Sequence, residues 1–392
     1  MENVLWTIAR RRYSAFPWTL TTILSTHSTR SWTTNRVSSS PQRYGLSSLR
    51  WVAGCSTKAS MIEETYLRPF SEIPVSPTAF DVNRLPRLME RYFEEYGPIF
   101  RIVVPGRGII VNISNPQDFE RLIKETSKNP VRPFFDSLRR VRELNEDNFF
   151  QKNCMGIFVE NGEEWWRVRS RVQTHTMKPS IVNSYLPRME EVANEFIVKH
   201  YLASPPTQSS LTTVFILYHL AINPEKQSLL QEELDQVLGD GSYPLTPQHM
   251  DKLRYTKACI KESLRMCPLS SILNRQTQHD ICLSGYSVPR GTTVFISLSE
   301  ASKNESYFPR SSEFLPERWL RNHPDQITNA YASIPFSVGT RMCVGRRLAE
   351  QEICILLSRY NVGYKYEPWN PTFRLFFYPD KSQSFTMIER QR

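Results

Sequence analysis

Apolar and polar positions recur along this chain with two periods, of which the helical one dominates. Apolar residues return every three or four positions in 85–97 and again in 116–126, which predicts two amphipathic helices. Between them, two apolar runs within 99–114 flank Pro105 and Gly106, a pattern typical of two strands joined by a turn. The first third of the folded region is therefore predicted to mix helices with one strand pair.

The second half of the chain predicts more helix than strand. Residues 211–222 are almost wholly apolar for about three turns, which is typical of a helix buried on all sides. Asn223 and Pro224 then predict the N-cap and first turn of an amphipathic helix that ends at Gly239. The other predicted elements are a helix after Asn161 and Gly162, a helix over 251–268, a small hairpin over 280–297 and a proline-rich loop after Asn304. The expected fold class is mainly α with a small β region.

Composition identifies a globular chain with an unusual first segment. The chain has 392 residues, of which 40% are hydrophobic, enough for one large core or two ordinary ones. Residues 1–58 hold eight Arg or Lys and one acidic residue, so they carry +7 of the formal net charge of +10. This Arg- and Ser-rich segment predicts a disordered mitochondrial presequence, and the alternative is a basic arm that contacts RNA or lipid headgroups. With no apolar run of about 18 residues, we expect a soluble or peripheral protein.

The cysteines argue against two common roles. There are seven, an odd number, and no two of them are spaced as CxxC. This pattern disfavours a disulfide framework or a zinc site and fits a reducing compartment.

One cysteine lies in a stretch that suggests chemistry, FSVGTRMCVGRRLAE at 336–350. Cys343 lies between Gly339 and Gly345, close to Arg341 and at the expected start of a helix. Helix-terminal amides stabilise a thiolate, and glycines allow the backbone to approach a large flat ligand. The stretch suits an anionic sulfur bound to a metal inside a macrocycle that carries carboxylates.

The pattern F-x-x-G-x-R-x-C-x-G, which begins at Phe336, resembles the haem-binding signature of the cytochrome P450 monooxygenases. A buried structural cysteine would explain Cys343 alone, but not the glycines and arginine at their spacings. The resemblance implies haem b as cofactor, Cys343 as the axial ligand of its iron and the catalytic residue, and the P450 fold. It also implies that one oxygen atom of O2 enters a C–H bond while the other leaves as water. The residues that it assigns to haem binding in this stretch are Phe336, Gly339, Arg341, Cys343 and Gly345.

A second group of residues resembles the family's structural network. Glu262 and Arg265, in KESLR, resemble its E-x-x-R motif, and FLPERW supplies Arg318 as the third charged member. Alone, a Glu–Arg pair three residues apart is usually a weak surface pair. The resemblance implies that the three side chains form a buried network with a structural role.

Three more residues resemble haem-propionate ligands. Trp165 and Arg169 match the family's W-x-x-x-R pair, and Arg275 lies where the family often has another arginine. Arginine forms charge-assisted hydrogen bonds with carboxylates, so this role is chemically reasonable. The alternative for each of them is a solvated side chain.

A cluster of basic residues on one helical face indicates which protein donates electrons. Lys257 and Lys261 are four residues apart on one helical face, as are the lysines that mitochondrial members present to an adrenodoxin-type ferredoxin. Arg346 and Arg347 would extend that face. The implied partners are this ferredoxin and its NADPH-dependent reductase, whereas the alternative is a solubilising face.

The resemblance fails in the middle of the chain. The family's central helix carries A-G-x-[DE]-T, whose acid and alcohol relay protons to bound oxygen, but LASPPTQSS stands at that place. Pro205 and Pro206 would break a helix there, no Asp or Glu lies nearby, and Thr207 or Ser209 is the candidate to replace the relay alcohol. Helices that roof the substrate pocket are also absent. We therefore predict a P450 domain over 59–392 that lacks part of its central helices near 201–211.

Three hypotheses follow for function. The first is a mitochondrial enzyme, on the matrix side of the inner membrane and in peripheral contact with it, that hydroxylates a lipophilic substrate such as a steroid or ecdysteroid. The second is a catalytically silent truncated isoform that retains haem or ferredoxin binding. The third is an unrelated basic binding protein. Under the first two, no nucleic-acid partner is expected.

Overall fold

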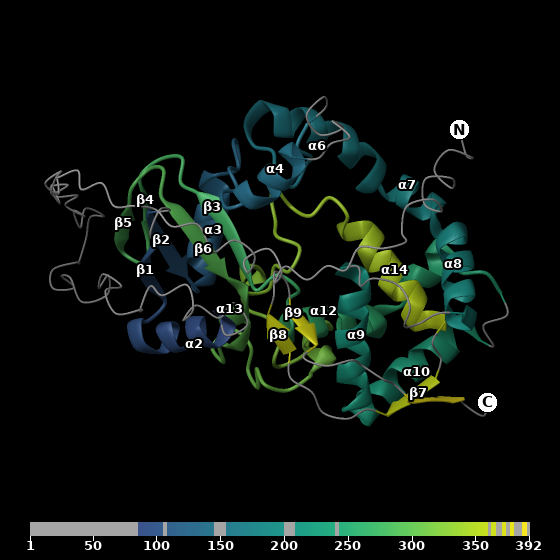
Figure 1. Cartoon of the computed structure of the whole chain (residues 1–392). Helices are drawn as coiled ribbons and strands as arrows, with labels where there is room; N and C mark the ends of the chain where they lie inside the picture. The colour runs from purple at the N-terminus through teal and green to yellow at the C-terminus, as the bar shows by residue number, and fades with distance from the viewer. Residues whose placement is uncertain are drawn as a thin grey trace, which may run out of the picture. The chain divides into compact units, whose positions relative to one another are not determined.

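The computed structural model (Figure 1) describes residues 85–104, 108–144, 154–199, 208–239, 243–359, 362–365, 371–373, 377–379 and 386–389. The expected presequence at 1–58 lies outside these ranges. So do the predicted turn at Pro105 and Gly106, the two central prolines, and Thr207. The predictions made for these residues stay predictions.

Helices make up most of the described chain, which confirms the mainly α class. Their periodic apolar positions lie on buried faces, as in α3, where Phe119 and Leu122 are fully buried. None of the helices in the described ranges is long and apolar enough to cross a bilayer. The α-helices are α2 (Leu85–Tyr96), α3 (Pro116–Glu125), α4 (Asp136–Glu143), α6 (Gly162–Thr176), α7 (Pro179–Ser184), α8 (Leu186–Lys199), α9 (Gln208–Ala221), α10 (Pro224–Leu238), α11 (Pro247–Lys252), α12 (Arg254–Met266), α13 (Leu298–Lys303) and α14 (Arg346–Arg359), and the 3-10 helices are η2 (Pro316–Trp319) and η3 (Ala330–Ala332).

A four-stranded sheet joins parts of the chain that are far apart in sequence. Its order is β1 (Ile99–Val104), β2 (Gly108–Ile113), β6 (Thr293–Ser297) and β3 (Ile272–Gln276). The β1–β2 pair is the predicted antiparallel hairpin, whereas β2 and β6 run parallel, with Ile110 opposite Thr293.

The predicted hairpin over 280–297 is correct only in its first part. Strands β4 (Ile281–Leu283) and β5 (Tyr286–Val288) pair with each other, but β6 leaves them and enters the main sheet. Val294 and Ile296 of β6 are fully buried there. Burial against two neighbouring strands therefore decides the place of β6, and local alternation does not reveal it.

The predicted helix over 251–268 is also broken. It divides at Leu253, whose ψ of 72° is not helical, so α11 ends before it and α12 begins after it. Leu253 is fully buried in the helical core, and this tertiary packing overrides the helical preference of the segment.

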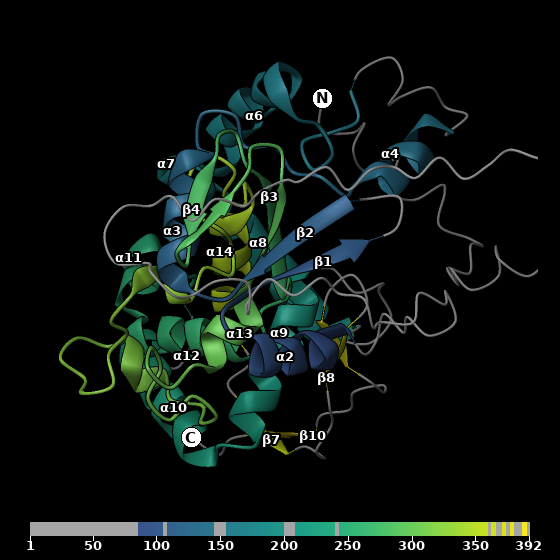
Figure 2. The same cartoon turned by 90° about the vertical axis from the view of Figure 1, so that its left-hand side faces the viewer.

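The two largest clusters of buried hydrophobic residues lie at the sheet and among the helices. Figure 2 shows α10 and α12, two of these helices, below the strands of the sheet. In the helical core, α9 packs against α10 and α12, and α14 packs against α8. Most side chains of α9 are buried around its whole circumference, as its sequence predicts. The remaining strands form two small pairs near the C-terminus: β7 (Val362–Lys365) with β10 (Thr386–Glu389), and β8 (Pro371–Phe373) with β9 (Phe377–Pro379).

Candidate functional site

The loop that carries Cys343 is held by its own backbone. The Cys343 N–H donates to the Phe336 carbonyl at 2.8 Å, and the Met342 N–H donates to the Gly339 carbonyl at 3.1 Å. The Cys343 side chain is exposed, and α14 begins three residues later, at Arg346. Cys343 therefore precedes α14. The helix was expected to start at Cys343, and it starts within one turn of that position.

The two glycines of this loop are needed for different structural reasons. Gly339 has a φ of 76°, a conformation that side chains disfavour, and a Cβ there would lie 3.4 Å from Ile123 Cγ2. A Cβ at Gly345 would lie 4.0 Å from Cys343 Sγ. Gly339 thus allows the turn, whereas Gly345 leaves space beside the sulfur.

The sulfur faces a cavity of about 510 Å³. The loop forms one wall, and Ser209 and Thr212 at the start of α9 line another part. Most of the remaining wall is apolar or aromatic, which is typical of a site for a large organic ligand. Among the residues that contribute to it are Phe135, Phe158, Trp165, Leu264, Ile272 and Leu348.

Trp165 and Arg169 enter this cavity from α6. Both are buried, and the Arg169 guanidinium lies 5.9 Å from the centre of the Trp165 ring. Arg169 Nη1 donates to the Met342 carbonyl at 2.8 Å, one residue before the cysteine. Burial lowers the pKa of Arg169, and the negative charge of Cys343 in its thiolate form opposes that shift. The structure thus brings this pair to the cysteine loop.

Arg341 packs against the same tryptophan ring, that of Trp165. Its guanidinium is 4.8 Å from the centre of the Trp165 ring and donates to the carbonyls of Pro130 and Glu160. It also donates to Asn161 Oδ1 at 2.9 Å. Asn161, which the sequence marks only as preceding a predicted helix, therefore anchors this arginine.

Arg275 reaches the loop from β3. It is fully buried, and its Nη2 donates to Ser337 Oγ at 3.2 Å. Its Nε is buried without a hydrogen-bond partner, as is the Nε of Arg341. Unsatisfied buried donors of this kind are costly, which indicates that an acceptor is missing from this structure.

Arg132 also lines the cavity, and sequence reasoning missed it. It lies beside Pro133 in an irregular segment, where no helical or strand period marks one face. Asn161 holds its backbone, accepting from the Arg132 N–H at 2.8 Å, and the Val131 carbonyl accepts from Gln276 N of β3. The neighbouring Phe134 has a φ of 76° and packs its ring against Phe295 at 5.3 Å. Only these tertiary contacts direct the segment towards the site.

The guanidinium groups of Arg132, Arg169 and Arg341 therefore line the cavity, and that of Arg275 lies behind its wall, bound to Ser337. Burial and the other three arginines lower the pKa of Arg341 to about 8, and burial with Arg132 lowers that of Arg275 to about 9. Among the described residues, none of the four forms an ion pair with a carboxylate. So much uncompensated positive charge fits a ligand with more than one anionic group.

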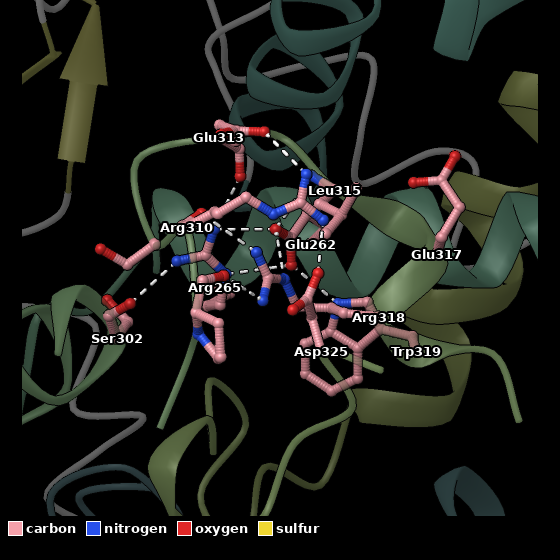
Figure 3. Close-up of polar contacts among 12 residues, drawn as sticks. Glu262, Arg265, Ser302, Arg310, Glu313, Leu315, Glu317, Arg318, Trp319 and Asp325 are labelled. Carbon is pink, nitrogen blue, oxygen red and sulfur yellow. Dashed lines mark hydrogen bonds and ion pairs between the residues drawn. The ribbon is translucent and has the colours of Figure 1, made fainter. Parts of the chain in front are cut away.

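The three residues predicted as a network meet in one buried cluster (Figure 3). The Glu262 carboxylate accepts from Arg265 Nη2 at 2.8 Å and from Arg318 Nε at 3.1 Å. It also accepts from the Leu315 N–H and from Trp319 Nε1 at 2.8 Å. Both guanidinium groups continue to backbone carbonyls, so the cluster ties α12 to η2 and to the loop before it.

The predicted basic face lies on the other side of the cysteine loop. Lys257 and Lys261 on α12 and Arg346 at the start of α14 line a second cavity. Arg347 is exposed next to Arg346. The structure thus places the four predicted cations on two neighbouring helices.

Of the two candidate alcohols for the proton relay, one is described by the structure. Ser209 lies in the first turn of α9 and lines the cavity that holds Cys343, whereas Thr207 lies outside the described residues. The described first turn of α9 contains no acidic residue.

This geometry defines a thiol-centred site for a large polyanionic ligand in a mainly α fold, and comparison identifies the class. A family model described as Cytochrome P450 matches residues 68–201 and 198–367. The chain belongs to the cytochrome P450 family. The two matched segments meet at 198–201, next to the region where the central helices are predicted to be missing.

Named relatives place the chain with the mitochondrial class of this family. It is 40% identical over 200 residues to a probable cytochrome P450 12b2, mitochondrial, of Drosophila melanogaster, a match that covers 49% of this chain and 37% of the relative. It is 36% identical to cytochrome P450 302a1, mitochondrial, of the same species, covering 60% of this chain and 48% of the relative. Cytochrome P450 CYP12A2 of Musca domestica is 35% identical, with 64% and 47% covered. The chain thus spans less than half the length of these relatives.

Haem b is the cofactor of this family, and the site fits it. Its two propionates match the uncompensated arginines and the unsatisfied Nε atoms of Arg275 and Arg341. The exposed sulfur of Cys343 would be available to hold the haem iron, and Gly345 leaves space beside it.

Proposed function

We propose that this chain is a haem-thiolate monooxygenase of the mitochondrial class that hydroxylates a lipophilic substrate with O2. One observation carries the proposal: an exposed thiol at the wall of a large apolar cavity, with four arginines that lack carboxylate partners among the described residues. The names of the relatives support a mitochondrial location, and we propose the matrix side of the inner membrane.

Several residues of the chain would bind different parts of the haem. Arg169, Arg275 and Arg341, together with Arg132, would hold the propionates, and Trp165 would pack beside them. Haem bound to a thiolate supplies the activation of O2, because the sulfur donates electron density that favours O–O cleavage. The apolar cavity wall would exclude water and orient the substrate.

Electrons would come from an adrenodoxin-type ferredoxin and its NADPH-dependent reductase. Lys257, Lys261, Arg346 and Arg347 lie on the far side of the cysteine loop from the substrate cavity, which supports a docking role. Such charge pairing accelerates encounter and weakens with salt. The resemblance to mitochondrial members, which mostly process sterols, supports a steroid or ecdysteroid as the substrate class.

One specific observation favours a second candidate, a silent isoform that binds haem or ferredoxin but does not turn over. The matched family segments meet at 198–201, and the described first turn of α9 offers Ser209 to the cavity but no acidic residue. Without an acid beside it, proton delivery to bound oxygen would be slow.

The reduced carbon monoxide spectrum tests haem-thiolate ligation. The full chain, reconstituted with haem, should show the family's red-shifted Soret band, and Cys343→Ala should abolish that band. An unchanged spectrum in the variant would refute the assignment of Cys343. Adding ferredoxin, reductase, NADPH and a panel of steroids then separates the candidates, because hydroxylated product supports the enzyme and haem binding without product supports the silent isoform.

A further inference from the structure

A second cavity, of about 490 Å³, lies on the opposite side of the cysteine loop from the one that contains the sulfur. Residues 335–337 and Leu264 line both cavities and so form the wall between them. The second cavity is bounded by α12, η2 and α14. Its volume falls in the range of pockets that hold small organic ligands.

The inner wall of this cavity is apolar and well packed. Ile260 and Leu264 of α12, Ile334 before the loop and Cys354 of α14 all line it, and each is at most 5% exposed. Phe336 completes this wall from the loop. An aliphatic chain inserted here would therefore leave water for a dry surface.

The rim of the cavity is cationic. Lys261 Nζ lies 5.6 Å from the centre of the Trp319 ring, and the Arg346 guanidinium lies 5.7 Å from that of Phe336. Glu350 is the one acidic residue of the lining, and it pairs with Arg346 at 2.9 Å. In the part of the chain that the structure describes, no carboxylate pairs with Lys257 or Lys261.

We propose that this cavity is a binding site for an amphiphilic monoanion, namely a free carboxylate with an aliphatic tail. The tail packs on Ile260, Leu264 and Ile334, and the carboxylate binds the two unpaired ammonium groups of Lys257 and Lys261. This assignment uses both halves of the cavity, because a purely polar anion would leave the apolar wall wet and a neutral apolar molecule would leave the lysines without a partner.

The site has a regulatory consequence, which rests on the proposed ferredoxin docking face. A carboxylate bound by Lys257 and Lys261 neutralises the charges that would attract the acidic ferredoxin. The bound anion should therefore weaken ferredoxin binding by competition.

Dodecanoate binding tests the proposal directly. Equilibrium dialysis of radiolabelled dodecanoate against the full chain, with and without haem, should show one saturable site, and dodecanol should bind more weakly. The double variant Lys257→Gln/Lys261→Gln should weaken dodecanoate binding by about tenfold or more, because hydrogen bonds to charged groups are lost. A matched control, Lys252→Gln/Arg254→Gln, removes the same charge from exposed positions that do not line the cavity. Equal affinities for dodecanol and dodecanoate, or equal losses in the two double variants, would overturn the proposal.

Photo-crosslinking locates the ligand. Dodecanoate with a diazirine at its tail should label Ile260 or Ile334, which line only the second cavity, and labelling confined to Phe158 or Ser209 would place it in the cavity of Cys343 instead and refute the site. A final titration measures ferredoxin affinity with and without dodecanoate. If ferredoxin does not bind at all while dodecanoate still labels Ile260, the proposed docking face fails and the carboxylate site stands.

Discussion

The Glu262 cluster gives a sharp test of how the fold supports the site. Glu262→Gln keeps the size of the side chain but replaces one carboxylate oxygen with an NH2 group. Glu262 Oε1 accepts from Arg265, Leu315 and Arg318, and Oε2 accepts from Arg265 and Trp319. Whichever oxygen is replaced, at least two donors would face another donor.

The magnitude follows from burial. Glu262, Arg265 and Arg318 are at most 2% exposed, so solvent cannot screen the two guanidinium groups once the carboxylate charge is removed. Breaking a buried ion pair by changing one partner costs about 3–5 kcal/mol of folding free energy. We expect Glu262→Gln to lose an amount in this range.

Urea unfolding of the haem-free chain, followed by far-UV circular dichroism, measures this loss without a contribution from ligand binding. The control is Glu313→Gln, because the Glu313 side chain is 56% exposed and pairs with Arg310 at 3.4 Å. Exposed pairs contribute about 1 kcal/mol or less, so the control should change little. If Glu262→Gln also lost less than about 1 kcal/mol, the cluster would not stabilise the fold through a buried ion pair.

Three further changes test other parts of the structure. Burial lowers the pKa of His219 to about 3. Below about pH 6.5 the unfolded state therefore binds a proton at His219 that the folded state does not, and the free energy of unfolding falls as the pH falls. Between about pH 7.5 and about pH 5 this loss is about 2 kcal/mol. His219→Gln should remove that part of the pH dependence in unfolding curves, and an unchanged dependence would contradict the lowered pKa of His219 in the folded state. Gly339→Ala should destabilise the chain by about 1–2 kcal/mol in thermal unfolding, because its φ of 76° disfavours a side chain. Gly345→Val should leave the far-UV spectrum intact but lower the haem bound per chain, since its side chain would crowd Cys343 Sγ; full haem occupancy would show that the ligand does not approach there.

Local sequence signals predicted the elements whose packing is also local. The predicted helix over 85–97 is α2, and the strand pair within 99–114 is the β1–β2 hairpin. Each of them has its apolar period and its end signals within a few residues of sequence. The loop motif at Cys343 was recognisable for a similar reason, because its glycines and arginine lie at fixed short spacings.

Two features of the structure could not be predicted from the sequence. Arg132 shows no period, and only the hydrogen bonds of its segment to Asn161 and β3 carry it to the site. Asn223 is the N-cap residue of α10, as predicted, but its side chain forms no capping hydrogen bond and donates instead to the His219 carbonyl of the preceding helix. The conformation at Arg132 thus depends on partners far along the chain, whereas the Asn223 side chain binds one of two local partners.

The parallel pairing of β2 with β6 has a consequence for how the chain folds during synthesis. At translation rates of about 5–20 residues per second, Thr293 leaves the ribosome on the order of ten seconds after Ile110, its partner in the sheet. Until then β2 is an open edge with Val111 and Ile113 lacking their final cover. The nascent chain is thus expected to need chaperone protection over this interval, and a ribosome stalled before β6 should yield a product prone to aggregate.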